Sequence, residues 1–429
     1  MAACTTLGVI LAGAKRSIHQ SFVSNTPANP SRTMSANHSV AAHYDGPFEI
    51  DALEAWATEV RKQFPSEEVS LGLVFTTPQF FEHATELLEI LRVHARIPLL
   101  LGCSSGSLIA NAQELEKEPG FVLSLYHLPD AKLNAIRFTQ AQVEQGEAEG
   151  FWSEETGVQD SNGWLVFADP FHLQGEQWLN QWNAAWPNAP ILGGLASGEH
   201  RAQRTQVYLN GDVYEDGGVA LSVGGGVALR SVISQGCTPI GETWTITRAE
   251  HNVIHEIGNR PAYEVLVETF EALSDTDKEK TRGNLFVGMV VNEYLDEFHR
   301  GDFLIRNLIG ADPKNGAIAV GALPRAGQTL QFQRRDARAA GEDFDELLHR
   351  ASETLEDATV YGGCLCCCNG RGKNLFGASD HDAGLVQHHL GDIGLSGFFC
   401  NGEIGPVGES NYLHGYTASL ALFVKKVNA

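Results

Sequence analysis

The sequence predicts an α+β protein made of two related lobes of mixed and antiparallel β-sheets flanked by helices. Apolar runs of strand type recur along the chain, amphipathic helical segments separate many of them, and residues 206–247 alternate with a period of two between glycine-rich turns. With 429 residues and 43% hydrophobic content, the chain can form two or three domains with sizeable cores. We predict a disordered N-terminal extension over 1–40 and two domains over 41–235 and 236–429.

The elements of the first half follow from hydrophobic periodicity. A helix over 50–64 precedes a strand over 69–77, and a helix over 80–93 precedes a strand that ends in the run LGCSSG. Further along the chain we predict strands near 120–127, 132–139 and 164–170, a helix near 176–186 and a strand ending in GGLASG at 193–198. Residues 206–247 are predicted to form a meander of antiparallel strands, with a hairpin turn at Asn210-Gly211.

The second half begins with a predicted helix over 261–273, where Pro261 suits the first helical turn. Strands follow near 284–293, 303–309, 317–321 and 329–335, and a helix near 339–355. The last predicted elements are a cysteine-rich strand, a short helix near 383–391, a strand over 397–403 and a closing strand over 414–424.

The first 38 residues contain no acidic residue and are rich in Ser, Thr, Ala and Asn. Their apolar run at 7–14 is too short to span a bilayer, and Lys15 and Arg16 follow it instead of preceding it as in a secretory signal. A disordered extension is our interpretation, with an organellar transit peptide or a start at Met34 as the alternatives. No other segment approaches the length of a membrane span.

Charge and cysteine content restrict the partners and the compartment. Fifty-three acidic and 30 basic residues give a net charge of −23, which repels nucleic-acid phosphates and anionic lipids, so we expect neither nucleic acid nor membrane as a partner. Three of the eight cysteines are consecutive, at Cys366 to Cys368, and neighbours on one strand point to opposite faces and cannot bridge easily. Free thiols fit a reducing compartment, and we predict a cytoplasmic protein.

Two glycine-rich runs are the strongest indication of a binding site. GGCLCCCNGRG at 362–372 and GFFCNGEIGP at 397–406 each begin like a buried strand and end in a glycine turn with one charged residue, Arg371 or Glu403. Such turns expose backbone groups where a ligand can approach closely.

These runs, together with HGYTASLALF at 414–423, resemble the C-terminal half of FIST proteins. LGCSSGSLI at 101–109, WLVFADP at 164–170 and LGGLASG at 192–198 resemble the N-terminal half. The resemblance implies an intracellular sensory module for small ligands such as amino acids, often joined to signalling domains, and it assigns no catalytic residue. We recognise no signalling segment and no F-box in this chain, so we expect a separate signalling partner protein.

The two halves also resemble each other at strand ends. GCSSGSLI at 102–109 and GFFCNGEI at 397–404 share a small-residue turn, while GGLASG at 193–198 and GGCLCC at 362–367 share the beginning of another strand. We interpret these matches as two lobes that each donate two strands to a common interface, which would place the ligand between the lobes.

The candidate ligand-binding residues lie around the glycine turns. Between Gly370 and Gly372, the Arg371 guanidinium would project from a bare loop and present its fork of donors to a carboxylate. Glu403, after Gly402, could hold an ammonium group; the alternatives are a structural salt bridge of Arg371 or a pair between Arg371 and Glu403. Thr417 either donates its hydroxyl to the pocket or is satisfied by backbone. The remaining candidates are Asn401, Cys366, Cys400, Ser104 and Ser197.

The cysteines leave three alternatives open. Cys364, Cys366 and Cys368 face one side of a strand and Cys367 the other, which argues against a zinc knuckle. Small buried packing residues are the default interpretation, beside a metal site that recruits Cys400 or His381 and a reactive thiolate near Arg371 or a histidine. H-E-x-x-H and P-loop motifs are absent from the sequence, and we expect no metal and no cofactor.

The leading hypothesis is therefore a cytoplasmic sensor that binds a small polar ligand, for example an amino acid, in signal transduction and without turning it over. The second is a cysteine-dependent enzyme or redox protein that uses Cys364, Cys366 or Cys400. The third is a protein-interaction scaffold like the F-box relatives.

Overall fold

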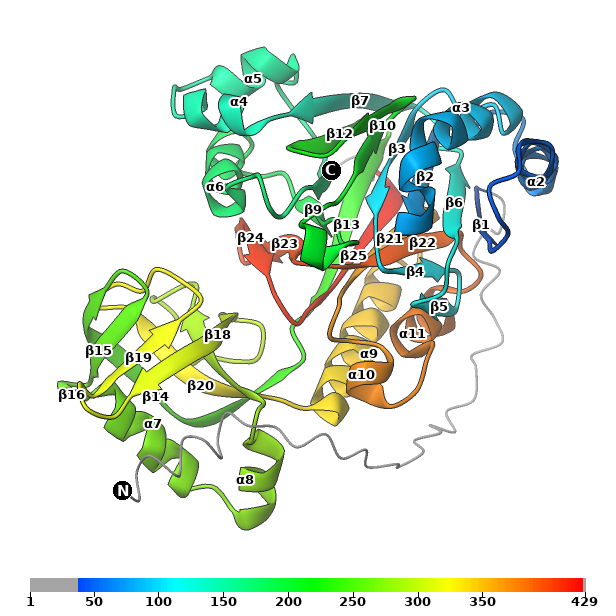
Figure 1. The fold of residues 1–429 in the computed structure, drawn as a ribbon. Helices are drawn as coiled ribbons and strands as arrows, with labels where there is room; N and C mark the ends of the chain where they lie inside the picture. Colours follow the sequence, from blue (N-terminus) through cyan, green and yellow to red (C-terminus); the bar gives the residue numbers. More distant parts are fainter. Residues whose placement is uncertain (1–37, 427–429) are drawn as a thin grey trace. The chain divides into compact units, whose positions relative to one another are not determined.

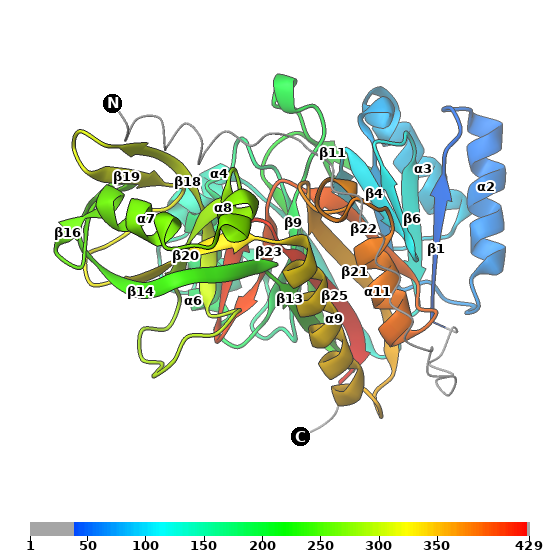
Figure 2. The same cartoon turned by 90° about the horizontal axis from the view of Figure 1, so that it is seen from below.

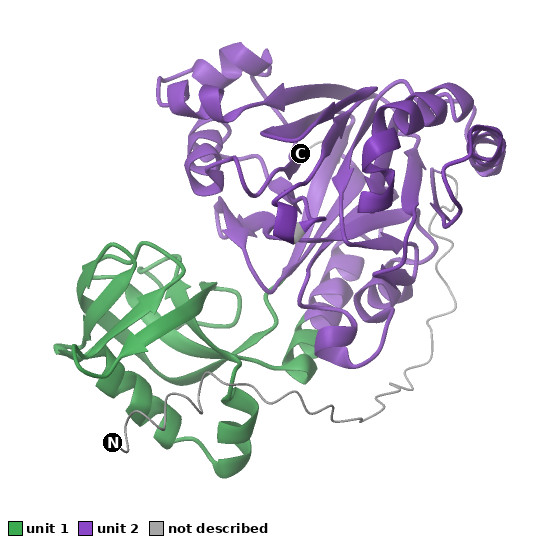
Figure 3. Cartoon of the chain, viewed as in Figure 1, with its two compact units in different colours: residues 1–21, 234–343 green, residues 22–233, 344–429 purple. Residues whose placement is uncertain are grey.

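The computed structural model of the protein describes residues 38–426, apart from the side chain of His200. Four mixed or antiparallel sheets flanked by helices confirm the α+β class. The described chain forms two compact units, unit 1 over Ser234–Asp343 and unit 2 over residues 38–233 and 344–426 (Figure 3). The first boundary between the units, after residue 233, lies two residues before the boundary that we predicted after residue 235. The return of the chain to unit 2 at Phe344 was not predicted. Of the predicted extension, 1–37 lies outside the described residues, and the first strand starts at Ser39.

Unit 2 contains three six-stranded sheets with a common plan (Figure 1). The strand order of the first sheet is β1 (Ser39–Tyr44), β6 (Phe121–Tyr126), β2 (Leu71–Thr76), β3 (Leu100–Ser104), β10 (Val207–Leu209), β11 (Asp212–Tyr214). The order of the second sheet is β7 (Ala131–Phe138), β12 (Gly218–Gly225), β8 (Trp164–Ala168), β9 (Ile191–Leu195), β23 (Glu403–Val407), β24 (Ser410–His414). The order of the third is β13 (Val227–Ser234), β25 (Ala418–Lys425), β21 (Val360–Cys368), β22 (Leu395–Cys400), β4 (Ser107–Ala110), β5 (Gln113–Glu116).

The centre of each sheet is a parallel strand pair joined by a helical crossover. The connections are η1 (Pro78–His83) with α3 (Ala84–His94), α6 (Gly175–Ala185), and α10 (Lys373–Phe376) with α11 (His381–Leu390). Each second strand carries a glycine opposite an apolar residue of the first, in the pairs Val74–Gly102, Val166–Gly193 and Leu365–Gly397. A Cβ at these glycines would lie 1.7, 1.9 and 1.9 Å from the carbonyl oxygen of the partner, so only glycine allows this approach.

This register shows which of the similar sequence runs are equivalent. GCSSGSLI and GFFCNGEI both begin on the second strand of a pair, as their similarity predicted. GGLASG belongs with them as a third member, and GGCLCC lies instead on the first strand of its pair. The repeated element is thus a β-α-β segment that occurs three times in unit 2.

The hairpin that follows each second strand is exchanged between the sheets. After β3, the hairpin β4–β5 pairs with β22; after β9, β10–β11 pairs with β3; and after β22, β23–β24 pairs with β9. Every repeat therefore completes the sheet of another repeat, in a closed cycle.

The three sheets enclose one central core. Phe75, Phe167 and Phe398 form a triangle in it, with ring centroids 4.9 to 5.7 Å apart. In the strand register, Cys366 is the residue of β21 that corresponds to Phe75 of β2 and Phe167 of β8. Cys366 pairs with Phe398 of β22, so the third phenylalanine comes from the second strand of its pair. Helices cover the outer faces. They are α2 (Ile50–Gln63) and α3 on the first sheet, and α9 (Ala337–Thr354) and α11 on the third (Figure 2). On the second sheet they are α4 (Gln140–Gln145), α5 (Phe151–Thr156) and α6 (Figure 1).

Unit 1 is a small closed β-barrel. Its strands pair in the cyclic order β14 (Cys237–Glu250), β20 (Thr329–Arg335), β17 (Leu285–Val290), β18 (Phe303–Asp312), β19 (Ala317–Val320), β15 (Val253–Ile257), and β15 pairs again with β14. The additional elements are β16 (Arg260–Pro261), α7 (Ala262–Glu271) and α8 (Asp275–Thr281). Closure leaves these six strands without a free edge.

The predicted meander over 206–247 is wrong as a single sheet, because β10–β11, β12, β13 and β14 belong to four different sheets. The helices α4, α5 and α8 were not predicted. Among the residues that the structure describes, no helix combines the length and the hydropathy that a bilayer span requires.

Candidate ligand site at the strand ends

Three turns meet where the second strands of the parallel pairs end. The amide of Ser197 donates to the Ser104 carbonyl at 3.1 Å, and the amide of Asn401 donates to the Leu195 carbonyl at 3.0 Å. On the third side, the Gly106 amide donates to Ser197 Oγ at 3.1 Å, and Ser197 Oγ donates to the Phe399 carbonyl at 2.6 Å. The turns thus form a closed ring of hydrogen bonds, in which the Ser197 hydroxyl completes the third link.

Side chains reinforce this ring. Ser105 Oγ donates to the Phe399 carbonyl at 2.8 Å, Ser104 Oγ donates to the Ser197 carbonyl at 2.9 Å, and Asn401 Nδ2 donates to the Ala196 carbonyl at 3.0 Å. The structure therefore brings Ser104, Ser197 and Asn401 together, as a common interface of glycine turns requires. Gly402 joins them, because its carbonyl accepts from the Leu195 amide at 2.8 Å.

The solvent side of the ring consists of amides and bare backbone. Asn369 and Asn401 are exposed, and Asn369 Nδ2 donates to Asn401 Oδ1 at 2.9 Å. Gly106, Gly198 and Gly370 are partly exposed beside them. Carboxyl ends of parallel strands are where ligands bind in many α/β sheets, and this surface offers both donors and acceptors to a polar molecule.

Arg371 is buried in the protein and does not project from an open loop. Its side chain is fully buried and makes a bidentate pair with Asp382, from Nε to Oδ2 at 2.6 Å and from Nη2 to Oδ1 at 2.9 Å. The expectation of a projecting guanidinium is therefore wrong, and the alternative of a structural salt bridge is confirmed with Asp382, not Glu403, as the partner. Gly372 allows the chain to turn after Arg371, because it has a φ of +61° and would clash with Glu116 if it carried a Cβ.

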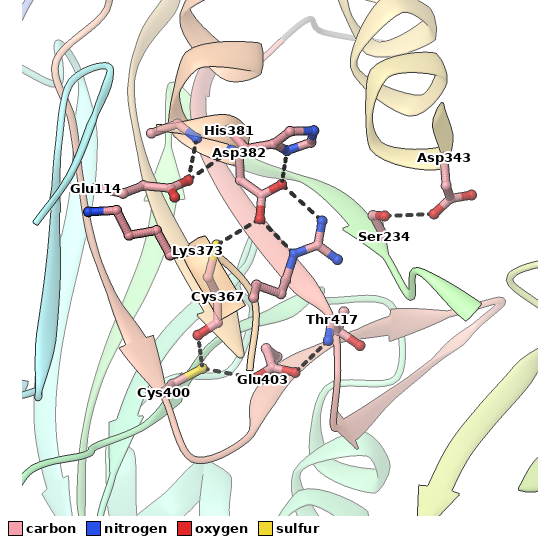
Figure 4. A network of polar contacts seen from close by, with 12 residues as sticks. Glu114, Ser234, Asp343, Cys367, Lys373, His381, Asp382, Cys400, Glu403 and Thr417 are labelled. Atoms are coloured by element: carbon pink, nitrogen blue, oxygen red, sulfur yellow. Dashed lines mark hydrogen bonds and ion pairs between the residues drawn. The ribbon is translucent and has the colours of Figure 1, made fainter. Parts of the chain in front are cut away.

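Asp382 is the hub of the buried polar contacts (Figure 4). Besides Arg371, it accepts from the Cys367 thiol at 3.6 Å and contacts His381 Nδ1 at 3.0 Å. Burial by itself would raise the pKa of Asp382, but the charge and hydrogen bonds of Arg371 outweigh burial and hold this pKa well below its ordinary value. Asp382 is therefore ionised at neutral pH, and the buried guanidinium is neutralised.

Glu114, on β5, closes the network from the other side. Its Oε1 accepts from the amides of Asp382 at 2.8 Å and Ala383 at 3.1 Å, at the beginning of α11, where the helix dipole favours a carboxylate. Burial and the nearby negative charge of Asp382 nevertheless raise the pKa of Glu114 to about 7. Glu114 is thus poised between its two protonation states near neutral pH.

Two polar atoms of this network are buried without a hydrogen-bond partner among the described residues. They are Nη1 of Arg371 and Oε2 of Glu114. Buried polar atoms of folded proteins nearly always find a partner in protein, water or ligand. Among the described residues, the network therefore leaves one donor free, as well as a carboxyl oxygen that accepts when Glu114 is ionised and donates when it is protonated.

Glu403 and Thr417 belong to the same chain of contacts. Glu403 is fully buried, its Oε2 accepts from the Thr417 amide at 3.0 Å, and its Oε1 accepts from the Cys400 thiol at 3.0 Å. The same thiol lies 3.3 Å from the Cys367 carbonyl, which connects Glu403 to the cysteine strand and to Asp382. The Thr417 hydroxyl donates to the Gly415 carbonyl at 3.0 Å, so the backbone-satisfied alternative is confirmed.

The cysteines of this region are packing residues. All seven described cysteines are free, and Cys364, Cys366 and Cys400 belong to the central core. Burial is the main cause that raises the pKa of Cys103, Cys366, Cys367 and Cys400, the opposite of what a nucleophilic thiolate needs. Across residues 38–426, no group of three or more His, Cys, Asp or Glu side chains is arranged to hold a metal ion.

The sequence did not single out Asp382, Glu114 or Ser105. Asp382 lies 11 residues after Arg371, in the first turn of α11. An acidic residue at the start of a predicted helix is a local pattern that could have indicated a partner for Arg371. Glu114 meets Asp382 across 268 positions, and no local pattern indicates this contact.

Comparison with known proteins identifies the family of this chain. Residues 70–260 match the FIST N domain and residues 262–406 match the FIST C domain. Uncharacterized proteins from two strains of Mycobacterium tuberculosis are each 36% identical over 368 residues, which cover 86% of this chain and 94% of the relative. An uncharacterized protein of Mycobacterium bovis is 35% identical over 378 residues, which cover 87% of this chain and 95% of the relative. With both domain matches and these relatives along most of its length, the chain belongs to the FIST family.

Proposed function

We propose that this protein is a sensory protein of signal transduction that binds a small polar ligand, for example an amino acid, without converting it. The observation that carries the proposal is the Nη1 group of Arg371, a fully buried donor without a hydrogen-bond partner among the described residues. A ligand carboxylate is the acceptor that matches it best, because bonds between a guanidinium and a carboxylate are charge-assisted.

The pair with Asp382 prepares Arg371 for this role. It holds Nε and Nη2 in place and fixes the plane of the guanidinium, so that Nη1 is oriented before a ligand arrives. The ring of turns supplies the remaining contacts, from the exposed amides of Asn369 and Asn401 and from the glycine backbone. Molecules that carry a carboxylate, including zwitterions, fit this combination better than cations without a carboxylate do.

The polar network offers a route by which binding is transmitted. Asp382 contacts Cys367, the Cys367 carbonyl contacts Cys400, and Cys400 contacts Glu403 at the start of β23. A shift at Arg371 would thus reach the exchanged hairpin of the second sheet. We propose that a separate signalling partner protein responds to this change. The free cysteines support a cytoplasmic location, and the net charge of −23 argues against nucleic acid and membrane as partners.

A thermal-shift screen against amino acids tests the proposal, with the corresponding decarboxylated amines as chemical controls. A ligand at 100 times its dissociation constant adds about 2.7 kcal/mol to the unfolding free energy. The informative variant is Arg371→Lys, which keeps a cation beside Asp382 but removes the Nη1 donor. Arg230→Lys, at an exposed position of β13, is the matched control.

We expect an amino acid to stabilise the wild type and Arg230→Lys, and to have no effect on Arg371→Lys. Stabilisation by the decarboxylated amines to the same extent would contradict carboxylate recognition. An equal effect on Arg371→Lys would place the ligand elsewhere, and no stabilisation by any compound would reject the proposal.

A further inference from the structure

The barrel of unit 1 exposes apolar side chains on two neighbouring loops, which we call the rim loops. They are residues 291–302, between β17 and β18, and residues 321–328, between β19 and β20. Both lie at the same end of the barrel, because Met289 at the end of β17 pairs with Leu330 at the start of β20, and the Thr329 amide donates to Glu293 Oε1 at 2.8 Å.

The rim loops hold the two most exposed large apolar residues of the described chain, Tyr294 and Leu323, and Leu295 beside Tyr294 is also exposed. Tyr294 is 95% exposed, Leu323 is 75% exposed and Leu295 is 39% exposed. Single exposed apolar residues are ordinary, whereas three on adjacent loops of one small domain indicate an interaction surface. Tyrosine is also among the residues that contribute most to binding energy at protein interfaces.

These loops are built to present their side chains outward. Asn292 Oδ1 accepts from the Tyr294 amide at 3.0 Å, and Asp302 Oδ2 accepts from the His299 amide at 2.7 Å. The Phe298 ring packs against Phe303 at the start of β18, with centroids 6.0 Å apart. These contacts hold both ends of the longer loop, while Tyr294 and Leu295 between them stay exposed.

The charge around the apolar residues is predominantly negative. The rim loops contain four carboxylates, Glu293, Asp296, Glu297 and Asp302, against two guanidinium groups, Arg300 and Arg325. Arg300 lies toward the base of its loop, where its Nη1 donates to the Ala339 carbonyl at 3.3 Å. Asp296 and Glu297 directly follow Leu295, are exposed, and form no ion pair with any described residue.

We infer that the rim loops are the docking surface for a basic amphipathic segment of a separate partner protein. The apolar face of such a segment covers Tyr294, Leu295 and Leu323, and its lysines or arginines face Asp296 and Glu297. A second copy of this chain is a poorer occupant, because each copy carries a net charge of −23. The inference does not depend on the ligand site at Arg371.

Fluorescence anisotropy with the full chain tests this surface. The probe is a labelled synthetic amphipathic helix of leucine and lysine, and the same helix with glutamate in place of lysine is the charge control. The apolar variant is Tyr294→Ser with Leu323→Ser, and the charge variant is Asp296→Asn with Glu297→Gln. The matched control is Ile309→Ser, because Ile309 is 60% exposed on β18 outside the rim loops. All these positions are exposed, so folding is retained.

We expect the lysine helix to bind the wild type and Ile309→Ser with equal affinity. Its affinity for both rim variants should be lower by at least about ten-fold. Equal binding to the rim variants would show that the helix follows net charge alone, and the inference would be overturned. Preference for the glutamate helix would also overturn it. Sedimentation of the wild type as a dimer that Tyr294→Ser with Leu323→Ser dissociates would replace the partner protein by a second copy.

Discussion

The hydroxyl of Ser197 donates to the carbonyl of Phe399 at 2.6 Å and joins turns that are 202 positions apart in the chain. The same oxygen accepts from the Gly106 amide, so one side chain contacts the ends of β3, β9 and β22. On the other two sides of the ring the backbones bond directly. Ser197 thus fills the one place where two backbones do not meet.

Replacing Ser197 by alanine is expected to destabilise unit 2. The Gly106 amide would lose its acceptor, whereas the Phe399 carbonyl would keep the Ser105 hydroxyl, so we expect a loss of about 1–3 kcal/mol. Urea unfolding followed by tryptophan fluorescence measures it, because six of the seven tryptophans lie in unit 2 and only Trp244 lies in unit 1. Ser231→Ala, at an exposed strand position, should change stability by less than about 0.5 kcal/mol. Equal effects of the two variants would show that the ring contributes nothing through Ser197.

Removal of the Arg371 side chain is expected to be far more costly. Arg371→Ala leaves the fully buried Asp382 without its cation, and breaking a buried pair in this way costs about 3–5 kcal/mol. The double variant Arg371→Met with Asp382→Asn removes both charges and should be less destabilised than the sum of the two single variants. A double-variant cycle in urea measures the difference. Strictly additive losses would contradict a direct energetic coupling between the two residues.

Glu114 is expected to make stability depend on pH in the neutral range. Its pKa in the folded state is about 7, above its ordinary value of 4.5, so the folded chain retains this proton more strongly than the unfolded chain. The unfolding free energy should therefore fall as the pH rises from 4.5 to 7, by on the order of 3 kcal/mol, and this contribution should be constant above pH 7.

The difference between wild type and Glu114→Gln isolates this contribution. Glutamine keeps a carbonyl for the amides of Asp382 and Ala383 but does not titrate. His38 and His43, whose pKa values burial lowers, act with the opposite sign and are common to both proteins. A stability difference that does not vary between pH 4.5 and 7 would be incompatible with the raised pKa of Glu114.

Gly397→Ala tests the close approach within the third parallel pair. The added Cβ would lie 1.9 Å from the Leu365 carbonyl oxygen, and because backbone cannot yield like a flexible side chain, we expect a loss of more than about 2 kcal/mol. Gly384→Ala on α11 is the matched control, since its Cβ meets nothing within 4 Å and alanine suits a helix better than glycine. The control should be neutral or slightly stabilised in urea. Tolerance of alanine at both positions would disprove the constraint.

The buried thiols are expected to react slowly in the folded protein. Burial raises the pKa of Cys366, Cys367 and Cys400, so iodoacetamide at neutral pH should modify each more slowly than it modifies free glutathione. Peptide mass spectrometry gives the rate at each site separately. Rapid modification of Cys400 in the folded chain would favour the hypothesis of a cysteine-dependent enzyme.

Sequence periodicity predicted most elements of the fold, because strands and helices that bury one face reveal their period locally. The parallel strands around Val74 and Val166 and the barrel strands after residue 284 were predicted close to their observed bounds, and the cysteine-rich strand around Leu365 was predicted without bounds. The glycine runs were correctly expected to meet, since a strand end that needs glycine usually marks a close approach.

What the sequence did not predict depends on contacts between distant segments. Arg371 lies between two glycines, as a ligand-binding arginine in an open loop would, but the turn directs it inward to Asp382. Its burial follows from the packing of α11 on the third sheet, which no local pattern encodes. Glu114 and Asp382 meet only because β4–β5 joins the sheet of β22. The exchange of hairpins, and with it the threefold plan, is likewise invisible in short matches of glycine-rich runs.

The exchange of hairpins has a consequence for how the chain can be divided and made. The second sheet cannot be completed until β23–β24 has been synthesised, roughly 200 residues after β9. The hairpin β4–β5 lacks its partner strand β22 for an even longer stretch of synthesis. Contacts of such long sequence separation slow folding, and the unpaired strand edges can meanwhile recruit other chains. A fragment cut between the two family domains at residue 261 would keep those edges permanently. The two halves are therefore expected to aggregate when expressed separately and to become soluble only when made as one polypeptide.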